Sequence, residues 1–211
     1  MDIVSNFQKI SNNIINKNIT IIAVSKTFKL NQIMPLIHLG HKHFGENKVQ
    51  ETLDKWIPDL LNEKNIHLHL LGKLQSNKVD DAVKMFSYIH SLDNEKLALK
   101  LSIAEKKMNR FLKYFIQVNI ASEPQKSGIA LDRADNFISF CLNELKLNVI
   151  GLMCLPPMSV DPVPFFKQLK LIAAKNNLKD LSMGMSQDYS MAIEFGATYV
   201  RIGSGIFGER N

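Results

Sequence analysis

The sequence predicts an α/β fold, a single (β/α)8 barrel of the TIM type, and three observations lead to this class. Eight short apolar runs alternate with amphipathic stretches along the chain. Such alternation favours parallel strands joined by right-handed crossovers, and eight strands close a barrel. The 211 residues fit one domain, 1–211, near the small end of the range for such barrels. The competing class, a doubly wound open sheet, is disfavoured because no Gly-x-Gly-x-x-Gly follows the first run.

The strands are expected where β-branched and aromatic residues gather between polar or glycine-containing loops. The first strand, from Thr20 to Ser25, is rich in β-branched residues and is predicted to be buried, and Pro156 ends the sixth. The eight expected strands span residues 20–25, 43–45, 67–71, 87–90, 114–120, 148–153, 180–183 and 198–202.

Amphipathic helices are expected between the strands, and several have recognisable end signals. Gly40 suits the C-terminus of the first helix, and Gly196 stops the last one. Asp93 is predicted to be the N-cap of the fourth helix and Ser186 the N-cap of the last. The expected helices span about 30–39, 47–62, 76–85, 94–109, 131–145, 162–176 and 187–195.

Composition excludes several classes of protein. Hydrophobic residues make up 45% of the chain, which is enough for a sizeable core. The 26 basic and 20 acidic residues give a charge of +6, but the lysines are scattered, so no nucleic-acid-binding arm is expected. No apolar run approaches the roughly 18 residues of a membrane span.

The two cysteines, Cys141 and Cys154, show neither metal-ligand spacing nor a disulfide framework. A reducing cytoplasm is therefore the expected location. The first residues lack a basic segment followed by an apolar one, so no signal peptide is expected. Because no second interface is obvious in the pattern, a monomer is expected.

Lys26 is the first candidate for a functional residue. The working face of a (β/α)8 barrel is formed by the loops after the strands, and Lys26 directly follows the first strand. Partial desolvation there favours the neutral amine, which is the form that attacks an aldehyde to make a Schiff base. The alternative is a lysine that extends from a strand end to solvent.

The segment from Arg201 to Gly208 is a candidate anion site. Its glycines let the backbone approach a ligand, and a short helix starting there would direct amide N–H groups at an anion. Many barrels bind phosphate after strands seven and eight. The segment from Ser182 to Ser186, on the neighbouring strand, adds hydroxyl groups. The alternative is a tight terminal turn.

The pair His67-x-His69 places two rings on one face of a strand, as some metal sites do. No His-Glu-x-x-His and no carboxylate set accompany the pair, so ordinary hydrogen-bonded histidines are favoured. A metal-dependent barrel hydrolase that uses these two histidines stays open as a less favoured alternative.

An ordered set of motifs resembles the pyridoxal phosphate homeostasis proteins, also called the YggS-like family. The resemblance covers essentially the whole chain. Its motifs are Ala23–Thr27, Phe44–Glu51, Leu71–Lys78, Ile89–Asp93, Gln117–Ile120, Lys126–Gly128, Gly151–Met153, Leu181–Ser186 and Val200–Gly203.

The resemblance implies a barrel similar to the N-terminal domain of alanine racemase, with pyridoxal 5′-phosphate held as a Schiff base on Lys26. It implies that Arg201 faces the pyridine nitrogen and keeps it unprotonated, and that Asn47 lies near the ring. The residues implied to hold the phosphate, or to lie in the segment that does, are Ser182, Met183, Ser186, Gly203 and Ser204.

The resemblance also implies a function in intracellular homeostasis of this cofactor, with no established catalytic reaction. PLP-dependent client enzymes are the partners that such a role would serve. The alternative is an amino-acid racemase that uses the same lysine, although 211 residues leave no room for the second domain from which alanine racemases take their tyrosine base. The chain departs from the family at Gln187, where an acidic residue is common.

Overall fold

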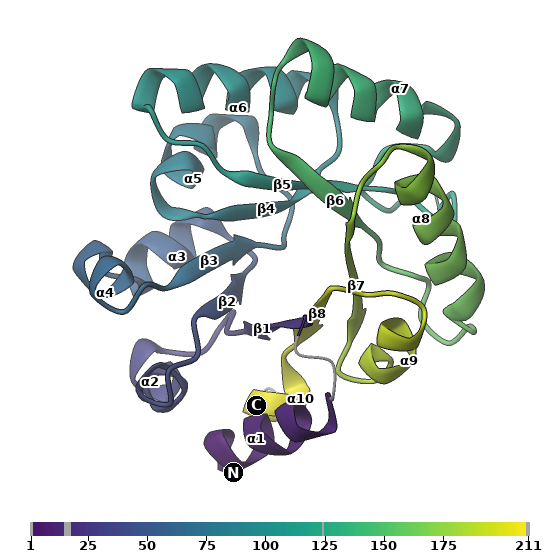
Figure 1. Cartoon of the computed structure of the whole chain (residues 1–211). Coiled ribbons are helices and arrows are strands. Elements are labelled where there is room, and N and C mark those ends of the chain that lie inside the picture. The colour runs from purple at the N-terminus through teal and green to yellow at the C-terminus, as the bar shows by residue number, and fades with distance from the viewer. Residues whose placement is uncertain (1, 15–17, 124, 210–211) are drawn as a thin grey trace.

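Eight parallel strands close into a barrel in the order β1 to β8, with β8 paired back to β1 (Figure 1). The structure is a computed structural model that describes residues 2–14, 18–123 and 125–209. The predicted (β/α)8 class is confirmed. The strands are β1 (Thr20–Val24), β2 (His43–Glu46), β3 (His67–Leu70), β4 (Tyr88–Leu92), β5 (Lys113–Gln117), β6 (Val149–Met153), β7 (Asp180–Met185) and β8 (Tyr199–Ile202).

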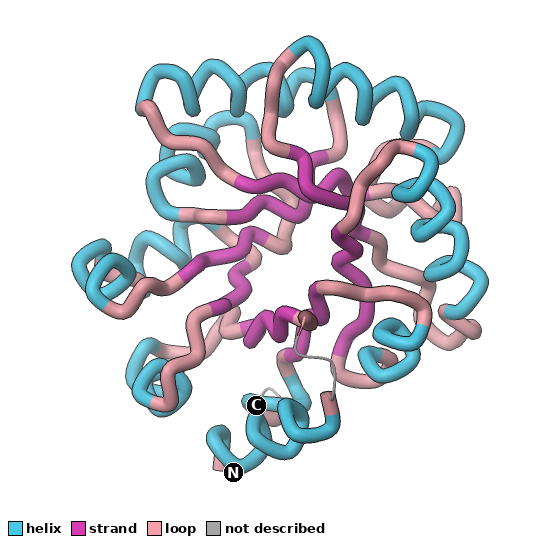
Figure 2. Tube along the Cα trace, in the orientation of Figure 1, coloured by secondary structure: helices cyan, strands magenta, loops and turns pink. Residues whose placement is uncertain are grey.

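Helices surround the barrel, as the tube in Figure 2 shows. At the edge formed by the two ends of the chain, α1 (Ile3–Asn13) lies beside α10 (Ser204–Phe207), and Asn6 Nδ2 donates to Ile206 O at 3.1 Å. The other α-helices are α2 (Leu30–His38), α3 (Val49–Lys55), α4 (Pro58–Glu63), α5 (Val79–Met85), α6 (Glu95–Met108), α7 (Ala134–Ser139), α8 (Val163–Lys175) and α9 (Tyr189–Glu194).

Three expected helices have irregular parts, and the one expected over 76–85 begins with a 3₁₀ turn. The helix expected over 47–62 is two helices, because Pro58 lacks an N–H and begins α4 at its first position after the extended residues Trp56 and Ile57. The helix expected over 131–145 has three segments, α7 between a 3₁₀ turn and a π turn. The short turns are η1 (Ser76–Lys78), η2 (Leu131–Arg133) and η3 (Phe140–Glu144).

Both predicted N-caps were wrong. The N-cap of α6 is Asn94, whose Oδ1 accepts a hydrogen bond from Leu97 N at 2.9 Å, and not Asp93. The N-cap of α9 is Asp188, because the Ser186 hydroxyl instead accepts a hydrogen bond from Gly205 N at 3.1 Å. Adjacent polar residues compete for a cap, and tertiary contacts decide which one is used.

The side chains of the strands form two cores. Residues that point outward, such as Ile21, Ala23 and Phe44, join one large apolar core beneath the helices. Inside the barrel a smaller cluster of Tyr88, Phe115 and Met153 is buried. The strand alternation that the sequence shows thus divides the side chains of each strand between a mostly apolar outer layer and a mixed inner layer.

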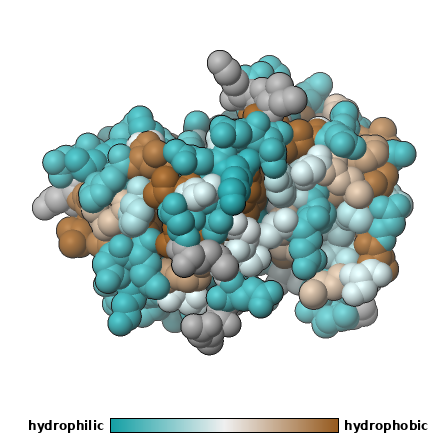
Figure 3. Space-filling model, turned by 90° about the horizontal axis from the view of Figure 1, so that it is seen from below, coloured by the Kyte–Doolittle hydropathy of each residue, from teal (hydrophilic) through white to brown (hydrophobic). Residues whose placement is uncertain are grey.

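The outer surface is mostly hydrophilic on the face shown in Figure 3, where hydrophobic residues form small separate groups. Within the described ranges, no helix is long and apolar enough to cross a membrane.

Candidate functional site

A cavity of about 300 Å³ lies where the carboxyl ends of the strands converge. Its volume is at the lower end of the range for small-molecule sites. Five residues predicted from the sequence are brought together here, since they follow or end β1, β2 and β8. The lining residues are Val24, Lys26, Asn47, Leu71, Met153, Leu155, Met185, Arg201, Gly203 and Ser204.

Lys26 stands at the tip of a tight turn after β1. Ser25 N–H donates to Gly45 O at 2.9 Å, and Phe28 N–H closes the turn by donating to Ser25 O at 3.1 Å. Thr27 has a φ of 72°, which is rare for a β-branched residue, and its N–H donates to the Glu51 carboxylate. Contacts on both sides of Lys26 therefore fix the backbone that presents it.

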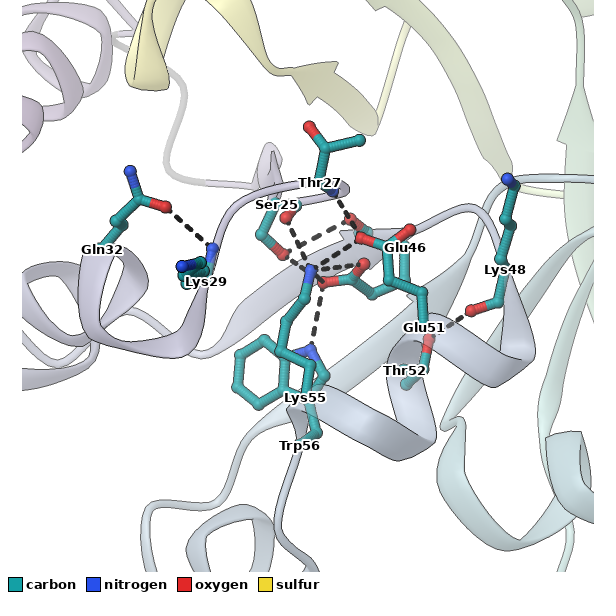
Figure 4. A network of polar contacts seen from close by, with 11 residues as sticks. Ser25, Thr27, Lys29, Gln32, Glu46, Lys48, Glu51, Thr52, Lys55 and Trp56 are labelled. Carbon is teal, nitrogen blue, oxygen red and sulfur yellow. Dashed lines mark hydrogen bonds and ion pairs between the residues drawn. The ribbon is translucent and has the colours of Figure 1, made fainter. Parts of the chain in front are cut away.

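A largely buried ionic cluster supports this turn from below (Figure 4). Lys55 Nζ donates to Ser25 O at 2.9 Å and forms ion pairs at 3.0 Å with Glu46 and Glu51. The Glu46 carboxylate also accepts from Ser25 Oγ at 2.7 Å and from Trp56 Nε1 at 3.0 Å. We define Ser25, Glu46, Glu51, Lys55 and Trp56 as the Lys55 cluster.

The charges of the Lys55 cluster depend on one another. Burial raises the pKa of Glu46, and Lys55 acts against that rise. For Glu51, burial acts to raise the pKa, but the Thr27 N–H and Lys55 outweigh it and leave the pKa lowered. A single ammonium group thus holds two carboxylates and the carbonyl of Ser25, so it links α3 to the turn that carries Lys26.

Arg201 supplies a buried positive charge to the cavity. Its Nη1 donates to Ser182 Oγ at 2.7 Å and its Nη2 donates to Cys154 O at 2.9 Å. Among the described residues, no carboxylate forms an ion pair with it. Burial lowers the pKa of Arg201, but a guanidinium stays protonated in proteins. Its five N–H groups exceed these two bonds, so the site suits a ligand acceptor.

The predicted phosphate residues gather at the start of α10. Gly203 is the N-cap of α10, and the Ser186 hydroxyl bonds to the backbone of that helix through Gly205 N. A second cavity, of about 520 Å³, contains Ser186 and shares Met185 and Ser204 with the first. Amide groups at a helix start lack intrahelical partners and favour anions.

Two predicted residues line neither of these two cavities. Ser182 is fully buried one layer deeper, where its hydroxyl contacts Arg201 and, at 2.9 Å, His90 Nδ1. Its assignment to the phosphate is therefore corrected. Met183 is also corrected, because it is fully buried in the outer apolar core. A register shift between Ser182 and Met185 turns Met185 into the cavity instead.

Gly184 makes that register shift possible. Its φ is +90°, and a Cβ there would lie 2.6 Å from the Ala192 side chain and 3.0 Å from the Tyr189 Cα. Gly72 has a different reason to be glycine, since a Cβ would lie 2.2 Å from the carbonyl oxygen of Asn47. This close approach holds the Asn47 backbone against the loop after β3.

Sequence reasoning missed the apolar walls of the cavity and the support of Lys26. Leu71, Met153 and Leu155 are apolar residues with no distinguishing local pattern. The signal for Lys55 was its position four residues after Glu51 on a helix, a common ion-pair spacing, but the spacing did not reveal that Lys55 is buried.

The histidine pair does not form a metal site. His69 is buried and contacts His43 through Nε2 and His90 through Nδ1, each at 3.0 Å, so both ring nitrogens are engaged. Among the described residues, no group of three or more histidine, cysteine, aspartate or glutamate side chains is arranged to hold a metal ion.

Comparisons with known proteins agree with this geometry. The profile of the alanine racemase N-terminal domain matches residues 2–211. The pyridoxal phosphate homeostasis protein of Synechocystis sp. is 35% identical over 206 residues, covering 92% of each chain. That of Aquifex aeolicus is 35% identical over 199 residues, covering 90% of this chain and 86% of its own.

Solved structures of related proteins have the same fold. PipY of Synechococcus elongatus, solved with PLP bound, has a TM-score of 0.87 and 30% sequence identity, covering 98% of this chain and 100% of its own. The same protein without PLP has a TM-score of 0.88 and 31% identity with the same coverage. Alanine racemase from Corynebacterium glutamicum, at 15% identity and a TM-score of 0.70, shares the fold over 99% of this chain and 61% of its own.

Proposed function

We propose that this chain, which belongs to the pyridoxal phosphate homeostasis protein family, binds pyridoxal 5′-phosphate on Lys26 and thereby helps to keep the free cofactor within bounds. The observation that carries the proposal is that Lys26 and Arg201 line one cavity of about 300 Å³ beside the start of α10. An amine, a buried guanidinium and an anion-binding helix start match the aldehyde, the pyridine nitrogen and the phosphate of this cofactor in turn.

The cofactor supplies an aldehyde that an amine can capture. The Lys26 Nζ attacks the aldehyde carbon, the new carbon–nitrogen bond becomes an imine, and the aldehyde oxygen leaves as water. Water reverses this reaction, so capture and release use the same residue. The apolar side chains of Leu71, Met153 and Leu155 restrict water in the cavity and so slow the release.

Arg201 has the second role in this proposal. An N–H of its guanidinium donates to the pyridine nitrogen, which must then act as an acceptor. The nearby positive charge also disfavours a proton on that nitrogen. An unprotonated ring withdraws electrons weakly, so Arg201 holds the cofactor without activating an amino acid bound to it.

The phosphate is assigned to the residues around α10. Ser186, Ser204 and Gly203 line the two cavities that meet there. Asn47 is assigned to the ring, since it lines the same cavity from the end of β2. The roles of these residues rest on their positions together with the chemistry of the phosphate.

We also propose that the chain does not catalyse racemisation. A two-base racemase needs a second proton-exchanging group on the other face of the substrate. Among the described residues that line the cavity of about 300 Å³, Lys26 and Arg201 are the ionisable ones, and a guanidinium does not exchange its proton near neutral pH. One exchangeable amine and one fixed guanidinium suit storage of the cofactor and its delivery to PLP-dependent client enzymes.

Absorbance spectroscopy with chemical trapping tests the proposal. Adding pyridoxal 5′-phosphate should produce the absorbance band of an imine, and borohydride should then fix one phosphopyridoxyl group on Lys26, located by peptide mass spectrometry. Lys26→Ala should abolish the adduct, whereas Lys29→Ala, an exposed lysine three residues away, should retain it. A wild-type chain that forms no adduct would refute cofactor binding, and steady interconversion of alanine enantiomers would refute the non-catalytic role.

A further inference from the structure

A file of hydrogen-bonded side chains crosses the interior of the barrel and ends at Arg201. His43 Nδ1 contacts His69 Nε2 at 3.0 Å, and His69 Nδ1 contacts His90 Nε2 at 3.0 Å. His90 Nδ1 contacts Ser182 Oγ at 2.9 Å, and Arg201 Nη1 donates to the same oxygen at 2.7 Å. We call His43, His69, His90 and Ser182 the histidine file.

The histidine file replaces what usually fills such a barrel. Bulky branched apolar residues dominate the interior of most (β/α)8 barrels. Here His69, His90 and Ser182 are all fully buried, and burial of polar groups is unfavourable unless each is hydrogen-bonded. Each of them has two hydrogen-bonding contacts within the chain of side chains that leads to Arg201.

Aromatic rings hold the file in place. Tyr88 stacks on His69 with ring centres 4.2 Å apart and an angle of 13°. Phe115 stacks on His90 at 4.3 Å and 21°. Tyr199 packs edge-on against Phe115 at 4.9 Å. Stacking on one face fixes the plane of each histidine ring, and the hydrogen bonds of both ring nitrogens fix its rotation within that plane.

The rings of the file are neutral. Burial lowers the pKa of His69 and His90 well below 6.5, and Arg201 lowers that of His90 further. Burial, His67 and His41, with Lys113 and Lys42, lower the pKa of His43 to about 4. A neutral imidazole has one donor and one acceptor nitrogen, so the direction of one hydrogen bond in the file dictates the direction of the next.

Arg201 sets that direction. Its guanidinium only donates, so Ser182 Oγ accepts from it. If His90 also donated to Ser182, the hydroxyl hydrogen would be left without an acceptor among the described residues, inside a fully buried site. The hydrogen bonds are all satisfied when Ser182 donates to His90 Nδ1, His90 Nε2–H donates to His69 Nδ1, and His69 Nε2–H donates to His43 Nδ1.

We propose that the histidine file is a positioning device for Arg201, in which three Nε2–H imidazoles point the Ser182 lone pairs at the guanidinium that faces the cofactor's pyridine nitrogen. This inference rests on the proposed function for its ligand, but the hydrogen-bond direction is a property of the protein alone. Ser182, His90 and His69 touch no cofactor atom in this scheme. They act through Arg201, which has no carboxylate partner among the described residues to fix it.

The first experiment measures the direction of the file. Nitrogen-15 NMR of the histidine rings, on the purified chain with and without added pyridoxal 5′-phosphate, should show His43, His69 and His90 as neutral rings with hydrogen on Nε2 from pH 6 to 8. Hydrogen on Nδ1 of His90, or titration of His69 or His90 near 6.5, would overturn the proposal. This result does not depend on whether the cofactor binds.

The second experiment measures the effect on the cofactor. Ser182→Ala and His90→Phe remove the last link of the file and should each raise the dissociation constant for pyridoxal 5′-phosphate about tenfold, the loss of roughly one oriented hydrogen bond. Both should also make the absorbance of the bound cofactor vary with pH between 6 and 8. His90→Asn keeps an acceptor near the Nδ1 position and should restore most of the affinity.

The controls separate this inference from the proposed function. Ser102→Ala, which removes another buried serine hydroxyl, hydrogen-bonded at 3.2 Å to Leu145 O far from the cavity, should leave affinity and spectrum unchanged. Wild-type affinity and spectra in folded Ser182→Ala and His90→Phe would overturn the positioning role. If the wild-type chain forms no adduct at Lys26, the proposed function fails, while the NMR result still decides the file. If the variants do not fold, the NMR result still tests the hydrogen-bond direction on which the positioning role depends.

Discussion

Replacing Lys55 by methionine tests the cluster that supports the Lys26 turn. Lys55→Met keeps the length of the side chain but leaves Glu46 without its cation. The two side chains are 7% and 0% exposed and their charged atoms are 3.0 Å apart, so solvent screening is slight. Removing one partner of a buried ion pair destabilises a protein by about 3–5 kcal/mol. We expect Lys55→Met to lose this much free energy of unfolding at pH 7.

The pH dependence gives a second check. In the wild type the folded-state pKa of Glu46 is raised above its unfolded value of 4.5. The contribution of Glu46 to the free energy of unfolding is therefore most favourable below pH 4.5 and is lost as the pH rises through the folded-state pKa. Without Lys55 that folded pKa rises further, so the variant's deficit should be largest near neutral pH and should shrink as the pH falls and Glu46 takes up a proton. Glu51 also makes the stability deficit of Lys55→Met larger at neutral pH than in acid. Its folded pKa is lowered, so its stabilisation is present above 4.5 and is lost in acid, and part of it comes from Lys55.

Urea denaturation at pH 7 and at pH 5 measures both effects. Trp56 is the single tryptophan and touches Glu46, so its fluorescence reports on the cluster, and far-ultraviolet circular dichroism reports on the whole chain. Lys64→Met is the matched control, since Lys64 forms an exposed pair with Glu63 at 3.9 Å and should change stability by less than about 0.5 kcal/mol.

A double variant distinguishes the charge from the packing. Adding Glu46→Gln to Lys55→Met removes the unpaired carboxylate and should recover much of the lost stability. The reasoning about the Lys55 cluster is wrong if Lys55→Met is within about 1 kcal/mol of the wild type, below the range expected for a buried pair. It is also wrong if the deficit is the same at both pH values.

Three further variants test other parts of the site. Gly184→Ala should lose about 2 kcal/mol or more of stability in urea denaturation, because it strains a φ of +90° and collides with Ala192; an unchanged midpoint would contradict this. Ser186→Ala should weaken binding of pyridoxal 5′-phosphate about tenfold in an absorbance titration but leave pyridoxal unaffected, and equal losses for both would exclude a phosphate contact. Arg201→Gln should raise the dissociation constant about tenfold to hundredfold, whereas an unchanged constant would remove Arg201 from the site.

The sequence predicted the strands well because their signal is local. Each strand is a short run of β-branched or aromatic residues, and the observed strands lie within or close to the expected ranges. It also brought Lys26, Asn47 and Arg201 together, since the carboxyl ends of parallel strands meet at one end of a barrel. These inferences need the order and type of the elements, and no contact between particular side chains.

The errors have a common physical cause. Ser182 and Met183 were assigned to the cofactor because they lie in the right segment, but depth along the barrel axis and the face of the strand decide what they touch. Met183 follows the inward-facing Ser182 and therefore points outward, whereas the register shift around Gly184 turns Met185 toward the cavity. The cap residues Asp93 and Asn94 differ only by tertiary context, since both residue types cap helices well.

By itself the sequence determined the barrel, the lysine after the first strand and the glycine-containing segment at the last one. Only the tertiary structure decided that Lys55 turns inward to Glu46 and that His69 joins His43 to His90. Neighbouring strands of a closed barrel bring such residues together through their register, although 21 to 26 positions separate the histidines along the chain. Spacing along one strand reveals which face a side chain takes, whereas its partner depends on how the strands are aligned around the barrel.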